Sequence, residues 1–277
     1  MATLRDGRPL AALCRRYGVT RGGFYAWQRR DESAHAKQDR DLTAEIVRRF
    51  ARHHERYGSP RIHREMVNGG WRVSRRRVAR LMRAASLRAR AVRGYRAKAS
   101  IRTRYAQHPN RLWTMTVTRP DQVWVGDITY LRVDGGWRYF AIVMDQYSRR
   151  ILAWTLTRRR TASVTCAVLA LAVQRRRPAP GVIFHSDRGS EYLGAPFCTA
   201  LARRGLVQSA SVRGPGDNPH AESFFHSCKA ELTRGVSFPD DRSLRTALQQ
   251  YVRYYNTQRM HSALGYQSPV AFERRAA

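Results

Sequence analysis

The 277-residue sequence is poor in acidic residues and almost free of lysine. Only 20 Asp and Glu residues oppose 52 basic ones, and all of the basic ones except Lys37, Lys98 and Lys229 are arginines. A net charge of +32 destabilises a compact chain by self-repulsion unless a polyanion neutralises it. Because the arginine fork matches phosphate oxygens and guanine edges, we expect a nucleic-acid partner. An RNA-associated protein and an arginine-biased genome are the alternatives, although genome bias does not account for the shortage of acidic residues.

Cysteine is also scarce, and long apolar runs are absent. The four cysteines form no CxxC pair, which argues against a zinc ribbon or a disulfide framework and fits a reducing cytosol. His53, His54 and His63 lack cysteine partners at zinc-finger spacing, so we expect surface or DNA-facing positions for them. The longest apolar run, residues 166–173, is far shorter than the roughly 20 residues of a membrane span, and the N-terminus has no apolar signal core. We therefore expect a cytoplasmic protein that is not associated with a membrane.

The first third of the sequence has the pattern of two helix-turn-helix units. Residues 1–35 hold two short helical segments, separated by Gly18, and Thr20 is a suitable N-cap for the second. Residues 36–90 hold three clearer amphipathic helices, the last one capped by Ser74. Arginines in its first turn oppose the helix dipole, which makes sense if this end enters a DNA groove; a solvated basic face is the alternative. The predicted DNA contacts of this helix are Arg75, Arg76, Arg77 and Arg80.

The remaining sequence predicts a linker followed by an α/β domain. Residues 91–120 are rich in arginine and have little apolar periodicity, so we expect a basic linker that can lie along phosphates. From residue 121 the pattern changes to residues typical of strands, followed by a hairpin signal at Asp134-Gly135-Gly136. Three antiparallel strands, then helix, strand, helix, strand and helix, predict a mixed five-stranded sheet with flanking helices over residues 121–277, with a C-terminal helical tail.

Three acidic residues of this domain lie in contexts where a carboxylate is costly unless it is paired or binds a metal. Asp127 lies within an apolar strand, Asp187 follows directly on another strand, and Glu222 lies near the start of a helix. Carboxylate oxygens are the ligands that Mg²⁺ prefers, and two such ions can drive phosphodiester transfer. Considered singly, Asp127 is explained equally well as a salt-bridge partner, Asp187 as a turn cap and Glu222 as a charge that complements the helix dipole. Spacing alone leaves three rivals open: Asp134, Asp145 and Glu191.

Three strings in the sequence, VWVGDITYL, FHSDRGSEY and DNPHAESFFHSCKAEL, resemble the signature blocks of IS-three-family insertion-sequence transposases. The intervals between Asp127, Asp187 and Glu222, 187 − 127 = 60 and 222 − 187 = 35 positions, also fit that family. Two further stretches extend the likeness over nearly the whole chain. RYGSPRIHREMVNGGWRVSRRRVARLMRAASLRAR resembles the family's helix-turn-helix module, and YNTQRMHSALGYQSPVAFE is similar to its C-terminal block.

This resemblance implies a DDE transposase with a ribonuclease H-like, retroviral-integrase-like catalytic core. Such an enzyme is a polynucleotidyl transferase with endonuclease activity, which cleaves DNA at the ends of an insertion sequence and transfers the freed 3′-hydroxyl. Asp127, Asp187 and Glu222 would then be the catalytic ligands of two Mg²⁺ or Mn²⁺ ions, and the rival carboxylates drop out. Lys229, which shares a helix face with Glu222 two turns earlier, would meet the transposon end. Ser227-Cys228 departs from the more usual Thr-Leu, but Cys228 is a small hydrophobe that should pack adequately.

The resemblance also implies a bacterial protein that is associated with the nucleoid, and it implies partners. They are double-stranded DNA, as terminal repeats and as target, further copies of the chain, and an upstream reading-frame product joined to it by frameshifting. A non-catalytic regulator that binds DNA ends without that upstream product is an alternative. A ribonuclease H or resolvase-type nuclease is another, although the two helix-turn-helix units count against it.

Overall fold

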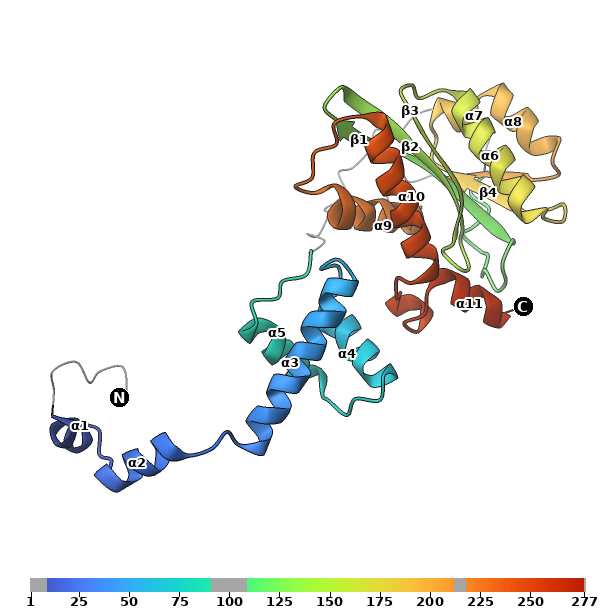
Figure 1. Ribbon diagram of the computed structural model, residues 1–277. Helices are drawn as coiled ribbons and strands as arrows, with labels where there is room; N and C mark the ends of the chain where they lie inside the picture. The colour runs from blue at the N-terminus through green and yellow to red at the C-terminus, as the bar shows by residue number, and fades with distance from the viewer. Residues whose placement is uncertain (1–8, 91–108, 212–217, 277) are drawn as a thin grey trace.

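The computed structural model describes residues 9–90, 109–211 and 218–276, which form an N-terminal helical region and a C-terminal α/β domain (Figure 1). The helical region consists of α1 (Leu10–Arg16), α2 (Arg21–Arg29), α3 (Ala34–Arg52), α4 (Ser59–Asn68) and α5 (Arg75–Ala84). The first half of the α/β domain consists of β1 (Val123–Val133), β2 (Gly136–Asp145), β3 (Ile151–Thr157), α6 (Ala162–Arg176) and β4 (Ile183–Ser186). The second half consists of α7 (Ser190–Leu193), α8 (Ala195–Ala202), β5 (Val207–Ala210), α9 (Pro219–Cys228), the π-helix η2 (Lys229–Thr233), α10 (Asp241–Thr257), the 3₁₀ turn η3 (Ser262–Leu264) and α11 (Pro269–Ala276).

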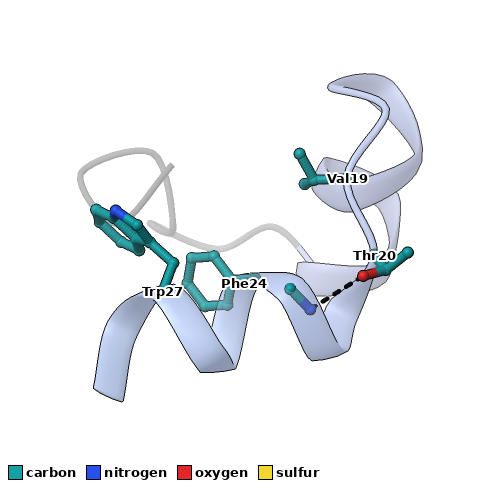
Figure 2. Close-up of a pocket in the computed structure, with 5 residues that line it drawn as sticks. Val19, Thr20, Phe24 and Trp27 are labelled. Carbon is teal, nitrogen blue, oxygen red and sulfur yellow. Dashed lines mark hydrogen bonds between the residues drawn. The ribbon is translucent and has the colours of Figure 1, made fainter. Parts of the chain in front are cut away.

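Helices α1 and α2 form a small unit at the far end of α3, away from the α/β domain (Figure 1). Its buried apolar side chains are Leu13, Cys14 and Phe24. The hydroxyl of Thr20 accepts a hydrogen bond from the backbone N–H of Gly23 at 3.0 Å, which is the predicted N-cap. Figure 2 shows Phe24 and Trp27 beside Val19 around an open, mostly apolar hollow. Trp27 is 58% exposed, so these two short helices leave part of their apolar surface uncovered.

Helices α3, α4 and α5 pack around buried side chains that are continuous with the core on the α9–α10 side of the sheet. The buried side chains from these three helices are Leu42, Ile46, Phe50, Ile62, Met66, Val78, Leu81 and Met82. Ser74 caps α5 as predicted, since its hydroxyl accepts from the N–H of Arg77 at 3.2 Å. On the outer side of α5, the Arg77 and Arg80 guanidinium groups donate to the Asp39 carboxylate of α3 at 2.7 and 2.5 Å. Arg75 and Arg76 are exposed, so the predicted DNA face keeps these two arginines turned to solvent.

The expectation of a surface position for His53 is wrong. Its side chain is buried, its ring stacks on Tyr57 with the centroids 3.8 Å apart, and its Nε2 lies 3.0 Å from a Glu65 carboxylate oxygen. His54 is exposed as expected, whereas His63 is half-buried. His53, directly after α3, is therefore buried because Tyr57 and Glu65 lie on either side of its ring and its Nε2.

The sheet of the α/β domain has the strand order β3-β2-β1-β4-β5. β2 pairs antiparallel with both β1 and β3, whereas β4 pairs parallel with both β1 and β5, so the predicted mixed five-stranded sheet is confirmed. The β1–β2 turn lies at Asp134-Gly135, at the predicted hairpin signal. Helices α6, α7 and α8 cover one face of the sheet and α9 and α10 the other (Figure 1).

Both ends of the α/β domain are fixed to the sheet. The Pro109 carbonyl accepts from the N–H of Ala210, and the N–H of Arg111 donates to the Ser209 hydroxyl at 3.0 Å, so the end of the predicted linker lies along β5. Residues 91–108 of that linker lie outside the described residues. At the other end, the buried Glu273 of α11 accepts hydrogen bonds from two arginines of the domain. None of the described helices is both long and apolar enough to span a membrane.

Candidate active site

The parallel pairing of β1 and β4 brings Asp127 and Asp187 together. The ladder joins Val123 to Ile183 and Val125 to His185. Two residues further along both strands, the same register sets Asp127 opposite Asp187, just where β4 has ended. Carboxyl ends of parallel strands are where ligands collect in α/β sheets, because the separating strands leave room for them. Two residues 60 positions apart thus become neighbours through three ladder positions.

Helix α9 brings Glu222 toward the same place. Asp127 has the same strand parity as Val125, whose side chain belongs to the core packed against α9, so both face the α9 side of the sheet. At the start of α9, the Asn218 amide donates to the Gly126 carbonyl at 3.3 Å and so holds the helix against β1. Glu222 lies in the first turn of α9 and is half-buried.

Gly126 allows β1 to approach the α7 side of the sheet closely. A Cβ at this position would lie 2.4 Å from Cζ of Phe184 and 3.2 Å from Cε1 of Tyr192, and rings buried in a packed core cannot move away. Glycine is therefore required here by the aromatic packing, and not by its backbone angles. The strand segment that carries Asp127 is fixed between these rings and Asn218.

The electrostatics of the site are those of carboxylates without enough compensation. Burial, and then the charges of Asp187 and Glu222, raise the pKa of Asp127 to about 7, although a hydrogen bond from the N–H of Ile128 at 2.7 Å opposes the shift. Burial also raises the pKa of Asp187, opposed by the N–H of Gly189 at 3.0 Å. Buried carboxylates that lie beside one another in this way are stabilised by a bound cation.

An arginine that we did not anticipate lies at the rim. Arg160, in the β3–α6 loop, donates through Nε to Glu191 at 2.6 Å, and its Nη2 lies 3.9 Å from a carboxylate oxygen of Asp187. Glu191 is only 5% exposed, while the Arg160 side chain is 44% exposed. Glu191 is thus neutralised as an ion-pair partner, whereas Arg160 keeps an open side next to the site. No signal distinguished Arg160 from the other arginines in the sequence.

Of the two remaining rival carboxylates, Asp134 lies in the β1–β2 turn and Asp145 is the last residue of β2. Asp145 is fully buried and accepts hydrogen bonds from the N–H of Asp121 and from both the N–H and the hydroxyl of Ser148. Asp134 accepts from the hydroxyl of Ser237. Their oxygen atoms stabilise turns, and neither lies in the register that joins Asp127 to Asp187.

Lys229 follows α9 directly and lies beside an exposed aromatic pair. Its Nζ is 4.7 Å from the ring centroid of Tyr130, and Tyr130 meets Trp137 edge to face at 5.1 Å. Tyr130 and Trp137 are 58% and 54% exposed, which is unusual for adjacent large rings and marks a surface to which bases could stack. Burial lowers the pKa of Lys229, while the Asp127 charge opposes that shift, so this ammonium group belongs to the same electrostatic site.

Comparison with known proteins agrees with this geometry. Two models described as "Integrase core domain" match residues 117–215 and 208–269, and a model described as "HTH-like domain" matches residues 37–95. "Transposase InsF for insertion sequence IS3A" of Escherichia coli strain K12 is 37% identical over 272 residues, which is 96% of this chain and 94% of that protein. This chain belongs to the IS3 transposase family.

Other matches are consistent with that membership. An "Insertion element IS600 uncharacterized 31 kDa protein" of Shigella sonnei is 35% identical over 95% of this chain and 98% of its own length. The solved "HTLV-2 integrase catalytic core domain in complex with magnesium" covers 56% of this chain and 97% of that one, at 13% identity and a TM-score of 0.44. A likeness that loose transfers no chemistry. The family models, together with the mixed sheet, confirm the ribonuclease H-like integrase core and the preceding helix-turn-helix-like region that the motifs implied, and with them a transposase that serves DNA transposition.

The residues of the site fit a hard divalent ion in their chemistry. Asp127, Asp187 and Glu222 offer carboxylate oxygens. The raised pKa of Asp127 means that its ionised form is disfavoured, and a nearby positive charge would stabilise that form. Within the described part of the chain, no group of three His, Cys, Asp or Glu side chains is already arranged to hold a metal ion. An ion bound by all three residues would require the carboxylates to draw together, which their mutual repulsion opposes until a cation is present.

Proposed function

We propose that this transposase cuts and joins DNA strands at the ends of an insertion sequence, with Asp127, Asp187 and Glu222 as ligands of two divalent ions, Mg²⁺ or Mn²⁺. The observation that carries the proposal is the state of Asp127. Burial and two neighbouring carboxylates raise its pKa to about 7, and no described lysine or arginine forms a salt bridge with it. In a chain with 52 basic residues, an unpaired half-buried carboxylate next to a second one supports a cation-binding role.

The proposed reaction has two phosphodiester steps. Water attacks the phosphodiester at the transposon end and leaves a 3′-hydroxyl and a 5′-phosphate. That 3′-hydroxyl then attacks a phosphodiester of another strand, forms the new bond and releases a 3′-hydroxyl from the cut target. When bound, the ions supply Lewis acidity at the attacking and the leaving oxygen.

The side chains around the triad have supporting parts in this proposal. Lys229 holds a phosphate of the transposon end near the carboxylates, and the exposed rings of Tyr130 and Trp137 stack on bases beside the cleavage point. Further away, Arg75 and Arg76 contact the terminal repeat from the start of α5, as recognition helices do.

We also propose the partners of this reaction. They are double-stranded terminal repeats and target DNA, further copies of the chain that hold two ends together, and the product of an upstream reading frame joined by frameshifting. The net charge of +32 supports the DNA partners directly, because it makes binding strongly dependent on counterion release.

The test compares Asp187→Asn with the wild-type protein and with Asp134→Asn, a matched control in the β1–β2 hairpin. Strand cleavage and joining are measured with Mg²⁺ on labelled terminal repeats, and end binding is measured in parallel at several salt concentrations. We expect Asp187→Asn to lose about 10³-fold or more in cleavage rate while binding and its steep salt dependence remain.

Full cleavage and joining by Asp187→Asn would contradict the assignment. If the wild-type protein bound ends but cleaved nothing, even with the upstream product added, the non-catalytic regulator would be favoured. Cleavage without joining, and without a need for specific ends, would favour a nuclease instead.

A further inference from the structure

Two sequence blocks that the triad does not explain meet in the structure. One is residues 57–61, which lead from the loop after α3 into the first turn of α4, and the other is residues 258–261, which follow α10. We propose that these blocks form a buried dock that fixes the helix-turn-helix-like domain relative to Lys229, with Tyr57, Arg61, Arg259 and Glu231 as positioning residues. The spacing between the bound repeat and the cleavage point is then set by the protein. This inference rests on the proposed function, since it concerns DNA bound at both places.

The first part of the dock is a set of hydrogen bonds that cross between the domains. The hydroxyl of Tyr57, a fully buried residue, donates to the Gln258 carbonyl at 3.2 Å and accepts from the N–H of Met260 at 2.9 Å. The Nε of Arg61 donates to the Met260 carbonyl at 2.9 Å. These bonds satisfy backbone groups just beyond the end of α10, which would otherwise lose their partners on burial. They join residues about 200 positions apart, so only the docked arrangement satisfies them.

Aromatic contacts surround these bonds. The His53 ring, stacked on Tyr57, lies 3.4 Å through Nδ1 from the hydroxyl of Tyr254 on α10. The Arg56 guanidinium lies over the rings of Tyr254 and Tyr251, at 4.7 and 5.3 Å from their centroids. Arginine stacked on buried rings holds a defined orientation, unlike a flexible surface cation.

The second part connects the dock to the catalytic helix. Arg259, next to the docked Met260, donates through Nη2 to Glu231 at 2.6 Å, and both side chains are almost fully buried. The same Nη2 lies 3.3 Å from the Ser227 hydroxyl at the end of α9. The hydroxyl of Tyr251 completes the set by donating to Glu231 at 3.1 Å. Arg259 therefore holds residues on both sides of Lys229.

Lys229 and Glu231 face opposite ways because they are two positions apart on a helix. Glu231 points into the core beneath α10, while Lys229 is half-buried against Tyr130 beside the triad. The π-helical turn that begins at Lys229 is a wide turn of the kind that often marks functional positions. Because the two residues share one helical turn, the hydrogen bonds that hold Glu231 in the core also fix the position of Lys229 beside Tyr130.

The energetics favour a positioning role over a stabilising one. Desolvating an arginine and a glutamate costs about as much as their attraction returns, so packed apolar residues would stabilise this place as well or better. A fully paired buried network does supply a single geometry, since any displacement leaves a charge without its partner. A fixed geometry between two DNA-binding surfaces is useful only if DNA spans both.

The test uses Tyr57→Phe, which keeps the ring stacked on His53 and removes the two cross-domain hydrogen bonds that the Tyr57 hydroxyl makes. Tyr147→Phe, a hydroxyl deletion away from the dock, is the control. Single-turnover cleavage is measured on the terminal repeat and on a repeat with five extra base pairs, half a helical turn, between its inner part and the cleavage point. Hydroxyl-radical footprints on both DNAs, in an Asp187→Asn background, report the same spacing without catalysis.

We expect the wild-type and Tyr147→Phe proteins to cleave the lengthened DNA at least tenfold more slowly and to lose protection of its outermost base pairs. Tyr57→Phe should lower this discrimination to about twofold, mainly by slowing cleavage of the natural repeat, with protection of the inner repeat retained. Arg61→Gln, which removes another bond of the dock, should do the same if Tyr57→Phe folds poorly.

Two results would overturn the proposal. One is unchanged discrimination in both dock variants, and the other is a wild-type footprint that extends to the terminus of the lengthened DNA. Failure of the proposed function has a different signature, because the wild-type protein would then cleave neither DNA while the footprints could still report the spacing.

Discussion

Asp127 and Glu231 are carboxylates on the same side of the sheet, yet the protein treats them in opposite ways. Glu231 is 2% exposed and accepts hydrogen bonds from Arg259 and from the hydroxyl of Tyr251. Asp127 accepts one from the adjacent backbone N–H of Ile128, and its pKa is raised to about 7. One carboxylate is fully compensated, and the other is left in need of a positive charge.

The difference shows what basic residues are used for in this chain. Arginine is abundant enough to pair with almost any acidic group, and Glu45, Glu65, Glu191 and Glu273 all have such partners. An unpaired Asp127 is therefore not a consequence of a lack of cations. It is consistent with a site whose positive charge arrives from solution and whose carboxylates must stay available until it does.

Removing the compensated carboxylate has the largest expected effect on stability. Glu231→Gln leaves Arg259 buried without its counter-charge, so we expect the free energy of unfolding to fall by about 3–5 kcal/mol. Glu32→Gln, which breaks an exposed pair with Arg40, is the matched control and should change it by less than about 1 kcal/mol. Urea denaturation measures both. Equal stability of the two variants would show that the Glu231 network does not hold the domains as described.

Removing the uncompensated carboxylate should instead raise the free energy of unfolding. The pKa of Asp127 is about 7 in the folded metal-free protein, against 3.8 as the ordinary value, so the folded state holds a proton that the unfolded state releases. The resulting stability is complete below about pH 4 and is lost as the pH rises through 7. Asp127→Asn stays neutral, so we expect it to raise the free energy of unfolding by roughly 1–3 kcal/mol at pH 8.5.

This gain should shrink as the pH is lowered toward 4, and urea titrations of the metal-free proteins across that range measure it. Asp134→Asn, in the hairpin, is the control for the removal of one carboxylate charge. A gain from Asp127→Asn that stays constant with pH would mean that folding does not disfavour the ionised form of the Asp127 carboxyl group.

Local signals in the sequence were sufficient for much of the fold. The caps at Thr20 and Ser74 are set by a side chain and a backbone N–H three residues apart, so the sequence contains both partners side by side. The β1–β2 hairpin follows in the same way from its turn residues. The carboxylates needed more than local reasoning, since physical arguments left six candidates and only the motif likeness separated them.

Long-range contacts account for what could not be predicted. Tyr57 and Met260 are 203 positions apart, and nothing near either residue indicates the other. His53 likewise contacts Tyr254, 201 positions away, and nothing near His53 in the sequence indicates that contact. Arg160 is one of many arginines, and only the loop between β3 and α6 brings it to Glu191.

Magnesium binding, read as thermal stabilisation at constant ionic strength, tests the central claim most directly. A ligand that binds only the folded state stabilises it in proportion to the logarithm of its concentration above the dissociation constant. At pH 7.5 we expect about 10 mM Mg²⁺ to raise the melting temperature of the wild-type and Asp134→Asn proteins by a few degrees, and that of Asp127→Asn or Asp187→Asn by much less. An equal rise in all four proteins would contradict the claim that these uncompensated carboxylates form the metal site.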